Sequence, residues 1–324
     1  MKLVLDYKNR YLQKQHRFDS LDVEKLVEYL EGEVEVTNFF NLLNSDSSSD
    51  DVIVYTSSQV EQYKQYIEDT MYFQNDNLMI PSYEVLKSHE NKFFQELYNR
   101  KHGIKTNIPA YLLGDKSEFE LLIEQDKLKL PFVVKGINGS SSVNVTICET
   151  FEEGREAIDK LYKPIVEAYN QLTPTNLHLY PGENSNHRQF IIQEYIELPD
   201  FDWRVHIMGD KYWGHKRKLV GDSKYASGKG SENDFSCDIP SFVLNYAKEV
   251  FSHIDSPFVI LDIVETNNDC ALIEWSAIQL GIVSLLNGER YYKLENNQWV
   301  RYNEKPNIEL EFARSINGYI KENK

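Results

Sequence analysis

The chain has 324 residues, of which 41% are hydrophobic and 13% aromatic, a composition that indicates a globular protein and excludes a disordered chain. Its formal net charge of −16 argues against a nucleic-acid binder, which would present a basic face, and makes any local cluster of Lys and Arg informative. The three cysteines are widely spaced and form no CxxC pair, so the sequence suggests neither a disulfide framework nor a zinc site. No apolar run is long enough for a signal peptide or a membrane span, so we expect a soluble, cytoplasmic protein.

Residues 1–81 have the pattern of a small α/β lobe. The expected elements are strands at Lys2–Leu5 and Val52–Tyr55 and helices at Leu21–Leu30 and Gln59–Met71. Thr56, Ser57 and Ser58 follow the second strand, at the position where open α/β sheets bind ligands, although a serine there could equally cap the next helix.

Residues 82–190 are expected to form a first nucleotide-binding lobe. The predicted helices are Tyr83–Tyr98, Ser117–Gln125 and Glu152–Tyr162, and the predicted strands are Ala110–Leu113 and Pro131–Val134. Pro164–Arg188 contains three prolines and is expected to be irregular.

Residues 191–324 are expected to form a second lobe, entered by a strand at Phe190–Ile196. The further strands predicted are Asp202–Met208, Tyr212–Lys216, Phe258–Val264 and Cys270–Trp275, and the helices are Pro240–Phe251 and Ile308–Ile320. Val220–Asp238 is rich in glycine and serine and is expected to be a loop.

The segment PFVVKGINGSSSVNV, residues 131–145, is the most informative motif. A buried-strand pattern delivers Lys135 into a loop that contains Gly139, Ser140 and Ser141. Glycine lets the backbone approach a phosphate closely, and loop N–H groups and hydroxyls can bind its oxygens. The motif therefore favours a nucleotide phosphate site, with a plain hairpin turn as the alternative.

Two carboxylates, Asp262 and Glu274, interrupt the apolar strands on either side of a predicted hairpin turn. Buried carboxylates are costly unless they are paired or bind a metal, and oxygen ligands of this kind suit Mg²⁺. The alternative is an exposed hairpin whose carboxylates simply face solvent.

Basic residues gather on the preceding strand pair: Arg204, His215, Lys216, Arg217 and Lys218. In so acidic a protein this cluster suits a phosphate or a developing acyl phosphate, although it could also be a solvated basic face. Ser227–Ser231 is a glycine-rich loop whose Lys229 could close over a triphosphate, or it is a bare surface loop.

The order of these segments resembles the ATP-grasp superfamily. The series runs from Lys92 and Lys135 through the strand Gln193–Ile196 and then Arg204, Arg217, Asp262 and Glu274. The resemblance covers about residues 82–300 and implies an α+β ATP-grasp fold with mainly antiparallel sheets, preceded by a pre-ATP-grasp lobe. The segments IPSYEVLKSHENK and KYASGKG also resemble an ATP-grasp subgroup associated with surface-polysaccharide biosynthesis.

The resemblance implies roles for individual residues. Lys92 and Lys135 would contact the α- and β-phosphates of ATP. Glu194, Tyr195 and Ile196 would hold adenine, and Asp202 or Asp200 the ribose. Arg217 would face the transferred phosphoryl group, with Arg204 and Lys229 as further catalytic cations. Asp262, Glu274 and Ser276 would hold Mg²⁺; the family usually has Asn where this chain has Ser276, so Gln279 could supply a ligand instead.

The implied activity is that of an ATP-dependent carboxylate–amine ligase that forms an amide through an acyl phosphate. A small-molecule kinase on the same fold and a non-catalytic ATP-binding module are the alternatives. The sequence names neither the acid nor the amine. The acceptor pocket is expected to involve the N-terminal lobe and the segments 165–188 and 220–238.

Overall fold

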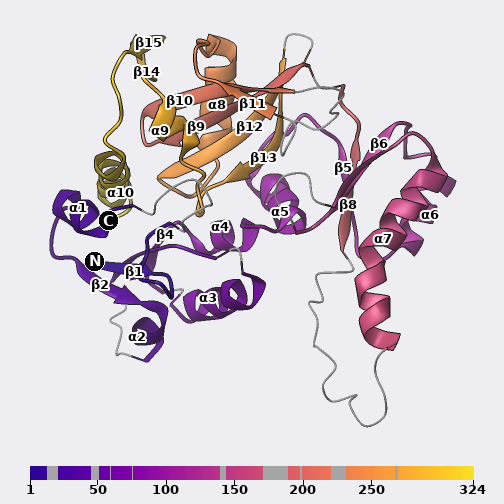
Figure 1. Cartoon of the computed structure of the whole chain (residues 1–324), viewed down its shortest axis with the longest axis horizontal. Helices are drawn as coiled ribbons and strands as arrows, with labels where there is room; N and C mark the ends of the chain where they lie inside the picture. The colour runs from indigo at the N-terminus through magenta and orange to yellow at the C-terminus, as the bar shows by residue number, and fades with distance from the viewer. Residues whose placement is uncertain are drawn as a thin grey trace.

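The computed structural model describes residues 1–12, 21–44, 51–58, 60–74, 76–138, 144–170, 189–197, 199–219, 231–266 and 269–324. The described elements form three sheets with helices between and around them (Figure 1). No helix in these ranges combines the length and the apolar character that a membrane crossing needs.

The N-terminal sheet is parallel, with strand order β2-β1-β3-β4. Its strands are β1 (Lys2–Leu5), β2 (Glu35–Asn38), β3 (Val52–Tyr55) and β4 (Leu78–Ile80), and its helices are α1 (Val23–Tyr29), α2 (Phe39–Asn44) and α3 (Glu61–Phe73). All four residues of β3 are buried, because this central strand is covered on both faces. The predicted α/β lobe is therefore present, with β2, α2 and β4 in addition to the expected elements.

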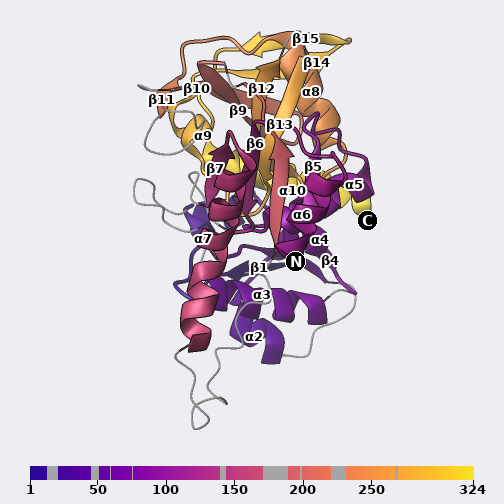
Figure 2. The ribbon, with the colours of Figure 1, turned by 90° about the vertical axis from the view of Figure 1, so that its right-hand side faces the viewer.

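The small sheet is antiparallel and has the order β5-β8-β6-β7. Its strands are β5 (Ala110–Leu113), β6 (Phe132–Gly136), β7 (Val145–Cys148) and β8 (Phe190–Glu194), and its helices are α6 (Ser117–Glu124) and α7 (Phe151–Asn170). Phe132 and Val134 pack with α6 and α7 on one face, so the alternation of the strand places Lys135 on the other. Figure 2 shows α7 running along this sheet.

The large sheet has the order β13-β12-β9-β10-β14-β15, and β11 pairs with β10. Its strands are β9 (Phe201–Met208), β10 (Lys211–Leu219), β11 (Ser231–Asp234), β12 (Phe258–Thr266), β13 (Asp269–Ser276), β14 (Tyr291–Glu295) and β15 (Gln298–Tyr302). The accompanying helices are α8 (Ser241–Phe251), α9 (Val283–Asn287) and α10 (Ile308–Asn323).

The two faces of the large sheet differ in character. One face is apolar and packs against α8 through residues such as Trp203, Val205 and Leu261. On the other face, Met208, Trp213 and Ile260 pack against the N-terminal sheet and α10. Farther along β9, β10 and β12 the same face becomes polar and carries charged side chains such as Arg204, Arg217 and Asp262.

The region between the lobes contains two helices where the sequence predicts one. The predicted helix Tyr83–Tyr98 is divided into α4 (Tyr83–Ser88) and α5 (Lys92–His102). Glu90 has a φ of 50°, which no helix continues through. The Asn91 side chain then accepts from the N–H of Phe94 and begins a new helix, with Lys92 as its first residue.

Three further boundaries differ from the sequence expectation. The helix expected to end at Tyr162 continues through Pro164 as α7, which costs a backbone hydrogen bond but does not end the helix. The expected loop 220–238 contains β11, whose polar residues gain their hydrogen bonds from the edge of β10. The predicted lobe boundary at residue 190 falls inside β8, so the change from the small to the large sheet follows Glu194.

Candidate active site

Helix α5 presents a polar stripe toward the small sheet. Lys92, Gln95, Glu96 and Asn99 follow the i, i+3, i+4, i+7 spacing that places side chains on one helical face. Gly103 ends the helix in the left-handed conformation, with a φ of 71°. The stripe lies along β13, the edge strand of the large sheet.

The backbone of β13 is held by this stripe. The Gln95 amide nitrogen donates to the carbonyl oxygen of Trp275 at 2.7 Å. The Trp275 indole Nε1 donates to Asn99 Oδ1 at 2.9 Å. These bonds satisfy an edge-strand carbonyl and a buried indole, and they fix the position of Glu274, the preceding residue.

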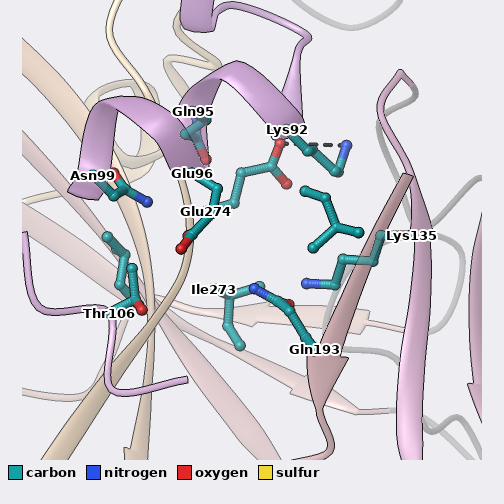
Figure 3. Close-up of a pocket in the computed structure, with 11 residues that line it drawn as sticks. Lys92, Gln95, Glu96, Asn99, Thr106, Lys135, Gln193, Ile273 and Glu274 are labelled. Atoms are coloured by element: carbon teal, nitrogen blue, oxygen red, sulfur yellow. Dashed lines mark ion pairs between the residues drawn. The ribbon is translucent and has the colours of Figure 1, made fainter. Parts of the chain in front are cut away.

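Lys135 extends from β6 toward α5 and β13 (Figure 3). Burial is the main cause that lowers the pKa of its ammonium to about 8; Lys92 acts in the same direction, while Glu274 and Glu96 oppose it. Gln193 on β8 lies beside it and is itself buried. The strand thus holds a desolvated cation that a phosphate oxygen would stabilise.

Lys92, Lys135 and Glu274 come together around one polar cavity, which we call the lysine–glutamate pocket. Its volume is about 20 Å³, room for about one water molecule, so the cavity by itself does not hold a nucleotide. Lys92 Nζ lies 3.6 Å from Glu274 Oε1, and the Glu274 side chain is 41% exposed. The pocket therefore combines two lysines with a carboxylate that remains accessible.

Glu90 connects this pocket electrostatically to the N-terminal lobe. Burial raises the pKa of its carboxyl, Lys92 lowers it and the nearby Glu274 raises it further. A left-handed backbone at a non-glycine residue is strained and persists only where its surroundings hold it. Glu90 is thus a neighbour of the pocket that the sequence reading did not single out.

A second charged group, the arginine–aspartate network, lies on β9, β10 and β12. Arg204 bonds both oxygens of Asp262, through Nε and Nη2, each at 2.9 Å. Arg217 bonds Asp202 through Nε at 2.7 Å and through Nη2, and its Nη2 also lies 2.9 Å from Asp262 Oδ2. The register explains the pairs, because Asp262 lies opposite Arg204 and Asp202 opposite Arg217.

The network balances its own charge in a buried setting. Burial raises the pKa of Asp262, but Arg204 and Arg217 outweigh it and hold that pKa below its usual range. Burial raises the pKa of Asp202 to about 6, against the opposing effect of Arg217. Two arginines and two aspartates thus neutralise one another, and 26% of the Arg204 side chain remains exposed against 6% for Arg217.

The predicted basic cluster is divided by the alternation of β10. His215 and Arg217 share the polar face with Arg204, whereas Lys216 points to the other face, 3.7 Å from the Phe201 ring centroid. Lys218 is paired with Asp234 of β11 at 2.6 Å. Successive residues of a strand cannot face one ligand, so the five residues do not form a single group.

Two histidines on the polar face are buried. Burial and the nearby arginines lower the pKa of His215 to about 4, and its ring nitrogens contact Ser284 and Asn233. Burial and then Arg204 lower the pKa of His206 to about 3. Both imidazoles are therefore neutral at physiological pH and contribute no cationic charge to the site.

The expected metal ligands are brought only partly together. Asp262 and Glu274 are cross-strand neighbours because a register shift between Asp262 and Ile263 moves the pairing by one residue, and Ser276 lies two residues on, opposite Ile260. However, both oxygens of Asp262 are engaged by guanidinium groups, and Gln279 donates to the backbone of Ser57 instead. Within the described ranges no group of three or more His, Cys, Asp and Glu side chains suits a metal ion. This arrangement does not fit Mg²⁺ at Asp262, and of the two expected carboxylates Glu274 is the more accessible.

The remaining predicted residues lie on or near β8, or outside the described ranges. Glu194 ends β8 and has Lys129 Nζ at 3.8 Å, with a third of its side chain exposed. Tyr195 and Ile196 follow in the connection to the large sheet, and Ile196 packs beside Val264. Asp202 is fully buried against Arg217 and is not presented to a ribose in this arrangement. Gly139, Ser140, Ser141 and Lys229 lie outside the described residues.

The structure adds pocket residues that the motifs did not identify. These are Gln95, Glu96, Asn99, Thr106 and Gln193. Most of them belong to the α5 stripe, whose helical spacing was readable in the sequence but was assigned to a longer helix. The role of α5 in holding β13 depends on a contact across 180 residues, which no local pattern reveals.

Comparison with known families gives one match over residues 89–274, more than half of the chain, to the RimK-like ATP-grasp domain. This match confirms the expected ATP-grasp fold class. A comparison with curated proteins gives no match.

Solved structures share this fold. An ATP-grasp RimK-domain protein from Sphaerobacter thermophilus is 9% identical with a TM-score of 0.54, over 98% of each chain. D-cycloserine synthetase DcsG is 14% identical with a TM-score of 0.53, also over 98% of each chain. D-alanine–D-alanine ligase from Bacillus anthracis, solved with ATP, is 13% identical with a TM-score of 0.51, over 88% of each chain.

Proposed function

The chain belongs to the RimK-like ATP-grasp family, and we propose that it is an ATP-dependent carboxylate–amine ligase that works through an acyl phosphate. The observation that carries the proposal is the convergence of Lys92, Lys135 and Glu274 from α5, the small sheet and the large sheet. Two desolvated lysines suit a polyphosphate, and the fold is shared with structures whose names describe them as ligases and a synthetase.

The proposed reaction has two steps. A carboxylate oxygen of the acid attacks the γ-phosphorus of ATP, and ADP leaves with the bonding electron pair. The amine nitrogen then attacks the acyl carbon, phosphate leaves, and the nitrogen loses a proton to give the amide. No covalent enzyme nucleophile is needed, so catalysis consists of orientation, charge stabilisation and exclusion of water.

Lys92 and Lys135 would bind the α- and β-phosphates in this scheme. Arg204 is the better placed of the two arginines to contact the transferred phosphoryl group, because a quarter of its side chain is exposed. Arg217 is almost fully enclosed by Asp202 and Asp262 and would act by positioning Asp262 and, through it, Arg204. The adenine contacts of Glu194, Tyr195 and Ile196 and the closing role of Lys229 are retained as parts of the proposal.

ATP binds Mg²⁺ in solution, so the nucleotide would bring the ion with it, and the ion would neutralise charge on the phosphates. Because two arginines engage Asp262, this carboxylate is not assigned a metal ion, and the steps above are assigned to the protein's own side chains. A role in surface-polysaccharide biosynthesis is supported only by the resemblance of two short segments, and the cytoplasmic location only by the sequence pattern.

The test is to supply ATP·Mg²⁺ and hydroxylamine with each of a panel of carboxylic acids and no amine. A ligase is expected to release ADP and to form a hydroxamate from its true acid, because hydroxylamine captures the acyl phosphate. Lys135→Met is the control, since it removes the predicted phosphate contact and should abolish both products.

Three outcomes would contradict the proposal. A phosphorylated product that survives hydroxylamine would identify a kinase. ATP binding without ADP release for any acid, with or without amines, would identify a binding module. Failure to bind a non-hydrolysable ATP analogue in calorimetry would remove the nucleotide site itself.

A further inference from the structure

A larger cavity lies against Tyr98 and His102 in the C-terminal half of α5 and shares no lining residue with the lysine–glutamate pocket. Its volume is about 340 Å³, within the range of small-molecule sites. It is lined by residues of β4, α4, α5 and α10 together with the Asp255 turn, none of which lines the lysine–glutamate pocket. Three tyrosines, Tyr83, Tyr98 and Tyr319, contribute their rings to its wall, and we call it the tyrosine pocket.

The hydrogen bonds of this wall hold the rings in place. Tyr98 Oη donates to the carbonyl of His253 at 3.2 Å and accepts from the N–H of Asp255 at 3.0 Å. Tyr319 donates its hydroxyl to Asp255 Oδ1. The Tyr98 ring stacks on His102 with centroids 4.1 Å apart. The aromatic surfaces are therefore fixed before any ligand arrives, which reduces the entropic cost of binding.

The polar groups of the tyrosine pocket are mainly acidic. Glu84 and Asp255 both line it. Lys101 and His102 are paired with Glu84, but 62% of the Lys101 side chain is exposed, and such a pair is weak in water. The hydroxyl of Ser82 is buried and has no hydrogen-bond partner among the described residues. Carboxylates beside aromatic faces suit a positively charged group that can donate hydrogen bonds.

The two pockets have no lining residue in common. Along α5, Lys92, Gln95 and Asn99 line the lysine–glutamate pocket, whereas Tyr98 and His102 line the tyrosine pocket. Lys92 is the first residue of the helix and His102 the last, so at roughly 1.5 Å per residue these two positions lie about 15 Å apart along its axis. The tyrosine pocket is therefore distinct from the lysine–glutamate pocket in its lining and in its place along α5.

We propose that the tyrosine pocket is a second ligand site, separate from the nucleotide site, which takes a small organic cation with an apolar or aromatic body. The cation lies against the tyrosine rings, with its N–H groups directed to Glu84 and Asp255. The net charge of −16 on the chain raises the local concentration of such cations.

Benzylammonium is the probe, with benzyl alcohol and benzoate as its neutral and anionic counterparts of similar shape. Titration of the full chain at pH 7, followed by ligand-observed NMR, should give saturable binding with a dissociation constant in the millimolar range or tighter. Benzyl alcohol and benzoate should bind at least about tenfold more weakly, and a saturating non-hydrolysable ATP analogue should not displace benzylammonium.

Tyr83→Leu removes one ring but keeps apolar volume and should weaken benzylammonium at least about fivefold. Tyr72→Leu is the matched control, because Tyr72 is 67% exposed and packs on Tyr83 at 5.8 Å but does not line the cavity. Glu84→Gln is an independent second variant and should weaken the cation while leaving benzyl alcohol unchanged. Thermal melting establishes that each variant is folded.

The proposal is overturned by any of four results. These are no saturable binding, equal affinity for the three probes, displacement by the ATP analogue, or unchanged benzylammonium affinity in both folded variants, Tyr83→Leu and Glu84→Gln.

Discussion

The arginine–aspartate network and the lysine–glutamate pocket lie on neighbouring parts of the same polar surface but differ in how their charges are matched. In the network, two arginines and two aspartates saturate one another with short, paired hydrogen bonds. In the pocket, Lys92 Nζ lies 3.6 Å from Glu274 Oε1, and 41% of the Glu274 side chain is exposed. The network is enclosed by its own hydrogen bonds, whereas the pocket keeps an accessible charged side chain, so the comparison predicts a structural role for the first and phosphate binding for the second.

The largest expected effect is a loss of stability when the arginine–aspartate network is broken. Arg217→Ala leaves Asp202 buried without its partner and should lower the free energy of unfolding by about 3–5 kcal/mol. Urea unfolding measures this loss. Arg204→Ala is the control, because Arg204 is more exposed and among the described residues its side chain bonds Asp262 alone, and its loss should be about half as large or less. If Arg217→Ala is as stable as the parent chain, the network is not structural.

Glu274→Gln should lower turnover strongly and change stability little, which is the opposite of the effect expected for Arg217→Ala. We expect turnover to fall at least about 100-fold, because the variant removes the charge that faces Lys92 and Lys135. The free energy of unfolding should change by about 0.5 kcal/mol or less, since the side chain is half exposed. Glu249→Gln, on the exposed side of α8, controls for the loss of a surface charge. A near-normal rate in Glu274→Gln would show that the accessible carboxylate has no role.

The pH dependence of nucleotide affinity tests the desolvation of Lys135. Its pKa is lowered to about 8 in the free protein, so the cation is present below pH 8 and is lost as the pH rises through that value. Affinity for a non-hydrolysable ATP analogue should therefore fall about tenfold between pH 7 and pH 9.

Calorimetry in buffers of different ionisation enthalpy adds a second readout for Lys135. Binding should be accompanied by proton uptake near pH 8.5, because the bound phosphate raises the pKa of the ammonium. Lys135→Met should show neither the uptake nor the fall in affinity. An affinity that stays constant up to pH 9 in the parent chain would contradict the assignment of Lys135 to phosphate.

The smallest expected effect concerns the contact that holds β13. Asn99→Leu removes the acceptor of the buried Trp275 indole and should cost about 1 kcal/mol of stability, with a modest fall in turnover as Glu274 loses its support. Asn245→Leu is a matched control, because Asn245 accepts from the indole of Trp299 in an exposed position. Equal effects of the two variants would show that α5 does not position the pocket.

Local sequence patterns predicted the strands whose burial follows a regular pattern along the chain. The apolar strands β3, β9 and β12 were found because burial on a sheet leaves a clear pattern. The divided helix at Glu90, the continuation of α7 through Pro164 and the polar strand β11 were missed. At Glu90 a strained backbone, and in β11 the pairing with the edge of β10, outweigh the local preference.

The sequence by itself determined the order of the chemical groups, since Lys92, Lys135, the basic strand, Asp262 and Glu274 follow one another as the family pattern requires. It also placed Asp262 and Glu274 on the two strands of one hairpin. The turn by itself would set Asp262 opposite Ile273, and a register shift between Asp262 and Ile263 brings Glu274 opposite Asp262 instead. Only the tertiary structure decided that Asp262 is enclosed by arginines while Glu274 is left accessible. That choice depends on which side chains of β9, β10 and α5 arrive beside each carboxylate, and such contacts between distant segments leave no periodicity in the sequence.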